Sequence, residues 1–141
     1  MATPEVPPGR LLATLLERAR RSPGQEICGL LVRDGDGAWH HWPVTNAHES
    51  PERAFLMEPG EQIAAFRALR ERAWTLAAIY HSHPEGEATP SATDAAEAAW
   101  ETLHLLVAPR AAAPVRGWWW DGGRFTEVAL PPPDGESVPG R

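Results

Sequence analysis

HSHPEGEATPSATD, residues 81–94, is the stretch from which both the fold and the chemistry of this chain can be predicted. One residue separates His81 from His83, seven separate His83 from Ser91, and two separate Ser91 from Asp94. Two imidazoles and a carboxylate are zinc ligands, and three protein ligands leave zinc's fourth tetrahedral position open, as in catalytic sites. The spacing therefore predicts a zinc site formed by His81, His83 and Asp94.

The flanking residues explain how these three side chains would meet. Residues 74–84 are mostly apolar and end at a proline, which predicts a buried strand. Side chains two positions apart on a strand share a face, so His81 and His83 are predicted to point the same way at its end. Ser91 is typical of a helix N-cap, and the alanine-rich helix that it would begin carries Asp94.

Each half of the stretch also has a simpler interpretation. Ser91 and Asp94 have the spacing of a capping box, which by itself predicts only the start of a helix. A histidine pair at the end of a strand can be polar and exposed without binding anything. Both patterns occur together within these fourteen residues, and the combination favours metal binding.

The same residues resemble the signature of the JAMM (MPN-plus) metalloproteases: a distant glutamate, then His-x-His, seven residues, Ser, two residues and Asp. The chain matches this signature at His81, His83, Ser91 and Asp94 without departure. The resemblance implies a JAMM and cytidine-deaminase-like fold, a single α/β (α+β) domain whose mixed β-sheet is flanked by helices. It also implies a zinc metallopeptidase in which Ser91 donates a hydrogen bond to the oxyanion.

The glutamate of the signature is expected upstream. SPGQEICGLLV (residues 22–32) resembles the family's segment of proline, glutamate, cysteine-glycine and apolar strand, which implies that Glu26 is the catalytic acid and base. Without the resemblance, nothing local favours Glu26 over Glu17 or Glu61, because an acid at the start of a strand is usually only solvated. The similarity also includes Asn46 and other segments, and it covers roughly residues 11–130.

Hydrophobic periodicity and turn residues predict the remaining elements. Helices are expected over residues 11–21, 59–74 and 92–101, and strands over 26–32, 38–44, 54–58, 74–84, 103–108, 115–120 and 124–130. The second helix is predicted to bury Ile63, Phe66, Leu69 and Ala73, and the third to pack on the sheet through Ala95, Ala96, Ala98 and Ala99. His40, His41 and His104 are predicted to be structural, core or exposed rather than ligands. Residues 1–130 would form the domain, and the Pro-rich tail, residues 131–141, is predicted to be disordered.

Composition narrows the class of protein further. An apolar fraction of 43% over 141 residues suits one globular domain, and no apolar run approaches the length of a membrane helix. The net charge of −6, with arginine as the only basic residue besides histidine, argues against a nucleic-acid surface. Cys28 is the single cysteine, which excludes an internal disulfide and the Cys-x-x-Cys of a deaminase zinc site. The first residues do not have the pattern of a signal peptide, so a cytoplasmic location is predicted.

Three functions from different classes remain open. The favoured one is a zinc peptidase or isopeptidase; the resemblance to short bacterial members implies, as its partner and substrate, a ubiquitin-like sulfur carrier protein that ends in Gly-Gly. The second is a metal-free MPN-type scaffold, which predicts that the ligands have been lost, although all are present. The third is a DNA-repair-associated JAMM-like protein, which would favour a basic surface and a helix-hairpin module that this sequence lacks.

Overall fold

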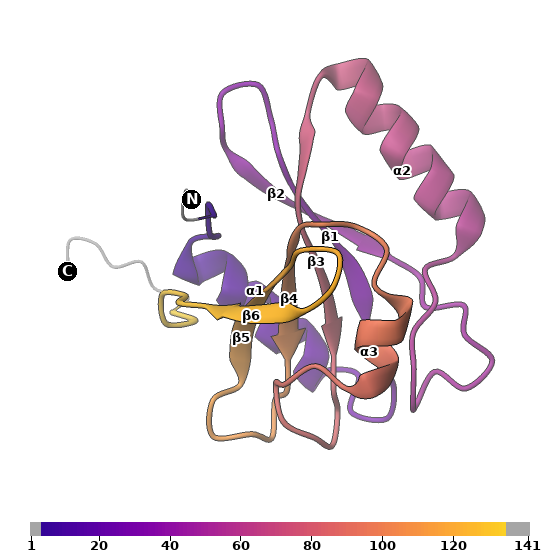
Figure 1. Cartoon of the computed structure of the whole chain (residues 1–141), viewed down its shortest axis with the longest axis vertical. Helices are drawn as coiled ribbons and strands as arrows, with labels where there is room; N and C mark the ends of the chain where they lie inside the picture. The colour runs from indigo at the N-terminus through magenta and orange to yellow at the C-terminus, as the bar shows by residue number, and fades with distance from the viewer. Residues whose placement is uncertain (1–3, 135–141) are drawn as a thin grey trace.

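A computed structural model describes residues 4–134, which form one mixed six-stranded sheet and three helices (Figure 1). In chain order the elements are α1 (Gly9–Arg20), β1 (Cys28–Arg33), β2 (Trp39–Val44), α2 (Pro59–Arg72), β3 (Thr75–Ser82), α3 (Ala92–Glu97), β4 (Leu103–Val107), β5 (Val115–Trp120) and β6 (Phe125–Val128). The strand order is β2-β1-β3-β4-β5-β6, and every neighbouring pair is antiparallel except β3 and β4. The predicted fold class is therefore confirmed.

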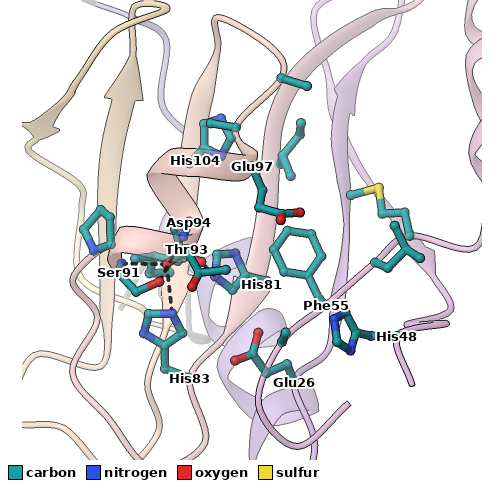
Figure 2. Close-up of a pocket in the computed structure, with 18 of the residues that line it drawn as sticks. Glu26, His48, Phe55, His81, His83, Ser91, Thr93, Asp94, Glu97 and His104 are labelled. Carbon is teal, nitrogen blue, oxygen red and sulfur yellow. Dashed lines mark hydrogen bonds and ion pairs between the residues drawn. The ribbon is translucent and has the colours of Figure 1, made fainter. Parts of the chain in front are cut away.

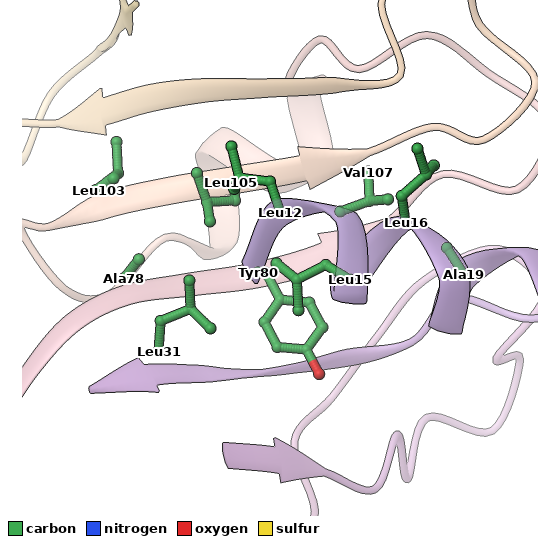
Figure 3. Packing of buried hydrophobic residues seen from close by; sticks show 10 residues of the cluster. All are labelled: Leu12, Leu15, Leu16, Ala19, Leu31, Ala78, Tyr80, Leu103, Leu105 and Val107. Carbon is green, nitrogen blue, oxygen red and sulfur yellow. The ribbon is translucent and has the colours of Figure 1, made fainter. Parts of the chain in front are cut away.

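Both faces of the central strands are covered, which explains their nearly continuous apolar sequences. On one face, α1 packs against alternate residues of β1, β3 and β4 (Figure 3). The buried residues of this cluster are Leu12, Leu15, Leu16, Ala19, Leu31, Ala78, Tyr80, Leu103, Leu105 and Val107. On the other face, Leu30 and Ile79 meet Ala65 and Leu69 of α2. Alternation along β1 and β3 thus divides the core between two helices.

Tyr80 is fully buried, and its ring lies over Gly29 of the neighbouring strand. A Cβ atom on Gly29 would come within 2.7 Å of the Tyr80 ring and 2.8 Å of the Trp42 carbonyl oxygen. We expect Gly29→Ala to lower the free energy of unfolding by about 1–3 kcal/mol, the usual cost of overpacking a core. Urea denaturation measures this loss. The control is Gly24→Ala, where nothing lies near the added methyl group; an equal loss in both variants would contradict the explanation.

The segment before α2 and the packing of α2 differ from the prediction. Residues 54–58 were predicted to be a strand but make only one isolated bridge, Asn46 to Met57, with backbone hydrogen bonds from Ala47 to Leu56 and from Glu58 to Thr45 on either side. The pairing does not extend towards Ala54, because there the Asn46 side chain bonds the backbone of Ala54 and Leu56. In α2 the buried residues are Ala65 and Leu69, whereas Ile63 is 61% exposed. Ala73 has a left-handed backbone and ends the helix, so it does not face the core.

The third helix is also shorter than predicted. It ends at Glu97, because Ala98 has an extended backbone, and none of its residues is buried. The prediction that the alanines at 95, 96, 98 and 99 pack closely on the sheet is therefore wrong. Figure 1 shows α3 as an isolated turn of helix beside the central strands. Its role is to present side chains to the end of β3 rather than to cover the core.

Histidines 40 and 41 have structural contacts, as predicted. His40 pairs with Asp34 and stacks on Trp74, and His41 bonds the Tyr80 hydroxyl group. Residues 131–134 are irregular, with the Pro132 carbonyl group packed against Gly9 of α1. The rest of the predicted disordered tail, residues 135–141, lies outside the described residues. Between residues 4 and 134, no helix combines the length and hydropathy needed to cross a membrane.

Candidate metal centre and active-site cleft

The end of β3 presents the two histidines of the signature to one site. His81 is the second-last residue of β3 and is 3% exposed, and His83 follows the strand directly. The His83 backbone N–H donates to the Val107 carbonyl group at 2.8 Å, so β4 continues to guide the chain after β3 has ended. The two rings meet edge to face, with centroids 5.0 Å apart. The predicted common direction of this histidine pair is confirmed.

The start of α3 supplies the carboxylate. Asp94 Oδ1 lies 3.1 Å from His81 Nε2, and Asp94 Oδ2 lies 3.2 Å from His83 Nε2 (Figure 2). A capping box fixes this carboxylate: the Ser91 backbone N–H donates to Asp94 Oδ2 at 2.9 Å, and the Ser91 hydroxyl oxygen accepts from the Asp94 backbone N–H at 3.0 Å. The simple interpretation of Ser91 and Asp94 as a helix cap is therefore correct, and the same cap directs Asp94 towards the histidines.

The donor set suits a divalent metal ion. Each of these three residues, His81, His83 and Asp94, offers one ligand atom. The three atoms all lie within 4.8 Å of one another. His81 Nε2 is buried, and no hydrogen bond among the described residues satisfies it even though Asp94 is near. A buried nitrogen without a hydrogen bond is costly unless something else occupies its lone pair. Two imidazoles with one carboxylate are the donors of catalytic zinc sites, so these residues fit zinc.

Charge balance at the site rests on Asp94. Burial alone raises the pKa of Asp94, but the neighbouring His81 and His83 imidazoles and the hydrogen bond from the Ser91 backbone N–H reverse the shift, and its pKa is far below the ordinary value. Burial lowers the pKa of His81, which favours the neutral imidazole. A neutral imidazole and an ionised carboxylate are the forms that bind metals.

Glu26 enters the same cleft because of the register between β1 and β3. Cys28 pairs with His81 in this antiparallel pair, and continuing the register by two residues places Glu26 opposite His83. Figure 2 shows Glu26 on the other side of the histidine pair from Ser91. Burial raises the pKa of Glu26 to about 7, with smaller effects from His83, which lowers it, and Asp94, which raises it. A carboxyl group with a pKa near neutrality can both accept and return a proton.

Asn46 holds the backbone around Glu26. Its side-chain amide donates to the carbonyl groups of Glu26 and Ala54 at 2.9 and 3.0 Å, and its oxygen accepts from the N–H groups of His48 and Leu56, both at 3.0 Å. All four bonds of the amide are therefore made within the protein. Asn46 thus connects Glu26 with the segment that carries Phe55, whose ring stacks on His81 with centroids 4.3 Å apart.

We expect Asn46→Asp to lower the free energy of unfolding by about 1–3 kcal/mol, because an acceptor would face the Glu26 and Ala54 carbonyl groups where the amide now donates. Urea denaturation measures this loss. Gln62→Glu is the matched control, because it makes the same chemical change in the same cleft. Equal stability of the two variants would show that the Asn46 bonds contribute nothing.

The cleft has a volume of about 480 Å³ and contains all five residues that the sequence singled out. It is also lined by Phe55, His48 and His104, none of which the sequence analysis assigned to the site. His104 is buried on β4, as predicted for a core histidine, and burial lowers its pKa, yet it also faces the cleft. No local signal marks Phe55, because its contact with His81 joins residues that are distant in sequence.

Cys28 contributes packing rather than chemistry to this region. It is 2% exposed, and burial raises the pKa of its thiol to about 12. A thiol with so high a pKa is not a nucleophile near neutral pH.

Fold and cleft together define a class: a small α/β domain with a candidate metal centre at the end of a central strand. A family model described as prokaryotic homologs of the JAB domain matches residues 8–121. The chain belongs to this family.

Individual relatives agree with the family assignment. The chain is similar to a protein of Haloferax volcanii named desampylase, with 32% identity over 125 residues, 85% of this chain and 88% of that protein. It is also similar to the CysO-cysteine peptidase of Mycobacterium tuberculosis, with 36% identity over 99 residues, 69% of this chain and 67% of that protein. The solution structure of a protein from Desulfitobacterium hafniense matches with a TM-score of 0.65 and 30% identity, covering 84% of this chain and 87% of that one.

Proposed function

We propose that this protein is a zinc-dependent peptidase or isopeptidase that hydrolyses the bond after the Gly-Gly terminus of a ubiquitin-like sulfur carrier protein. The observation that carries the proposal is one cleft in which His81, His83 and Asp94 converge and a buried glutamate lies opposite them. Membership in the family and the peptidase named among the relatives support the type of reaction. A scaffold would not need this set of residues.

Each residue of the proposed site has a separate role. His81, His83 and Asp94 would hold the zinc ion. Glu26 would take a proton from the attacking water and return it to the leaving amine, a function for which a pKa near the working pH is favourable. Ser91 would donate its O–H to the oxyanion; capping uses the serine oxygen only as an acceptor, so the proton stays available.

Bound zinc would act as a Lewis acid: it would lower the pKa of a water molecule towards neutrality and polarise a carbonyl group. The chain's own residues would do the rest. Phe55 covers one face of His81 and restricts the access of bulk water to that ring.

A protein substrate would enter the cleft with a narrow tail. Glycine lets a backbone approach other groups closely, because it has no side chain. Leu56 and Trp100 line the cleft and are 49% and 36% exposed, which gives the rim an apolar surface for the folded part of a carrier protein. The relatives named desampylase and CysO-cysteine peptidase support a small protein as the substrate.

The experiment incubates the zinc-loaded protein with a Gly-Gly carrier protein from the same genome that bears a short C-terminal extension. Mass spectrometry should detect the loss of the extension and a new terminus at Gly-Gly. The same carrier with Ala-Ala in place of Gly-Gly is the control, and we expect it to be cleaved much more slowly. Equal cleavage of unrelated peptides, or an intact carrier after prolonged incubation, would overturn the proposed substrate.

The proposal extends to the domain and its location. We place the catalytic domain at residues 1–130, because every residue with a proposed role lies there. We also keep the cytoplasm as the proposed compartment, because Cys28, the single cysteine of the chain, needs no oxidising environment.

A further inference from the structure

The loop between β3 and α3 shapes the candidate metal centre. The His83 Nδ1 atom lies 2.8 Å from the backbone carbonyl oxygen of Glu87. Since a carbonyl oxygen can only accept, Nδ1 carries a proton and donates it, so in the neutral imidazole the Nε2 lone pair is left for a ligand. Partners of this kind fix both the tautomer and the ring orientation of metal-binding histidines. The position of the Glu87 carbonyl group is therefore part of the site.

The loop around Glu87, residues 84–90, has no regular secondary structure to hold it. Ala88, the next residue, is fully buried and packs with Leu106 and Ala108. The Ala88 carbonyl oxygen accepts a hydrogen bond from the Trp118 indole Nε1–H at 3.0 Å. Trp118 also packs against this small cluster, so β5 holds the loop by a directed bond and by apolar contact.

Trp118 is itself fixed by its neighbours on the sheet. The Arg116 guanidinium lies over the Trp118 ring, 4.9 Å from its centroid, and makes two 2.8 Å hydrogen bonds to the Glu127 carboxylate. Arg116 also donates to the Thr89 hydroxyl oxygen at 3.2 Å, a second contact with the same loop. The indole N–H therefore has a defined direction, and it points to the residue next to Glu87.

We propose that Trp118 is a positioning residue for His83: its indole N–H holds Ala88, and through it the Glu87 carbonyl group, where that group orients the His83 imidazole. The inference rests on the proposed metal site. It assigns a role to one member of the Trp118–Trp120 run, whose neighbour Trp119 instead packs against the core cluster of α1 on the other face of the sheet.

The test compares Trp118→Phe with Trp119→Phe, which makes the same change one residue away on the opposite face. Hydrogen exchange of the metal-free proteins reports on the loop, and competition with a chelator gives the zinc dissociation constant. Because one neutral hydrogen bond changes an equilibrium constant about fivefold, we expect residues 86–89 to exchange about fivefold faster and zinc to bind about fivefold more weakly in Trp118→Phe. Trp119→Phe should match the wild type in both measurements.

Unchanged loop exchange, or faster exchange with an unchanged zinc dissociation constant, would overturn the positioning role while leaving the metal site intact. No zinc binding by the wild-type protein would instead overturn the proposed function and this inference with it. If Trp118→Phe does not fold, benzothienylalanine at position 118 replaces the N–H with sulfur and keeps the shape of the ring. The same changes in loop exchange and zinc affinity are expected for that variant, and their absence would overturn the positioning role.

Discussion

Replacing Glu26 with glutamine is expected to lower kcat by about 10²–10⁴-fold, the usual contribution of a general base such as the one proposed here, without reducing the proposed zinc binding. The amide preserves the shape of the side chain but cannot take a proton from water. Steady-state hydrolysis of the extended carrier protein and elemental analysis of the purified variant measure the two quantities. Glu97→Gln is the control, because Glu97 is an exposed glutamate on the rim of the same cleft. Full activity of the Glu26 variant would show that another residue is the base.

The same variant makes a prediction about pH that does not depend on activity. Burial raises the pKa of Glu26 from 4.5 to about 7. Between these values the unfolded chain has lost the Glu26 proton while the folded, metal-free protein retains it, so the contribution of Glu26 to stability falls as the pH rises from 4.5 through 7. Glu26→Gln should remove this loss. Urea denaturation of both metal-free proteins at pH 5 and pH 8 measures it, and the same pH dependence in both would contradict the raised pKa.

Zinc bound at the proposed site would change the pH dependence of the proposed reaction in a defined direction. A bound divalent cation favours the ionised form of a nearby carboxyl group and so lowers its pKa. We therefore expect the acidic limb of the wild-type rate profile to lie below pH 7, at a lower pH than the titration of Glu26 in the metal-free protein. Glu26→Gln should show no such limb.

Asp94→Ala is expected to abolish stoichiometric zinc binding and, with it, detectable hydrolysis. Asp94 contacts both histidines and carries the only carboxylate among the three proposed ligands, so its removal leaves two imidazoles. Loss of an outer-shell partner of a metal costs about 10–100-fold in affinity, and we expect the loss of a ligand itself to cost at least about 100-fold. Chelator competition and metal analysis measure the change.

Thermal unfolding gives a second measurement for Asp94. Zinc at 100 times its dissociation constant should stabilise the wild-type protein by about 2.7 kcal/mol, and the variant should show no such gain. Because Asp94 also caps α3, Asp94→Asn is included to keep the side-chain acceptor for the Ser91 N–H. Glu97→Ala, an acid of the same helix outside the triad, is the control. One zinc per chain in Asp94→Ala would rule out the proposed ligand set.

The sequence was informative where the signal is local. His81 and His83 were expected to share a direction because side chains alternate along a strand, and Ser91 and Asp94 were expected to begin a helix because their spacing is that of a capping box. Both expectations need only a few consecutive residues. Boundaries and buried faces were less predictable: Ile63 fits the apolar face of a helix by its sequence, yet α2 buries the face of Ala65 and Leu69.

By itself, then, the sequence determined the strand, the helix cap and the three candidate ligands between His81 and Asp94, and resemblance to a family added Glu26. The tertiary structure decided the rest of the cleft. The β1–β3 register carries Glu26 to His83, Asn46 joins Glu26 to the segment of Phe55, and Trp118 reaches the loop beside His83. These contacts connect residues far apart in the chain. Their geometry follows from how the strands pair and pack, which the periodicity of any single segment does not encode.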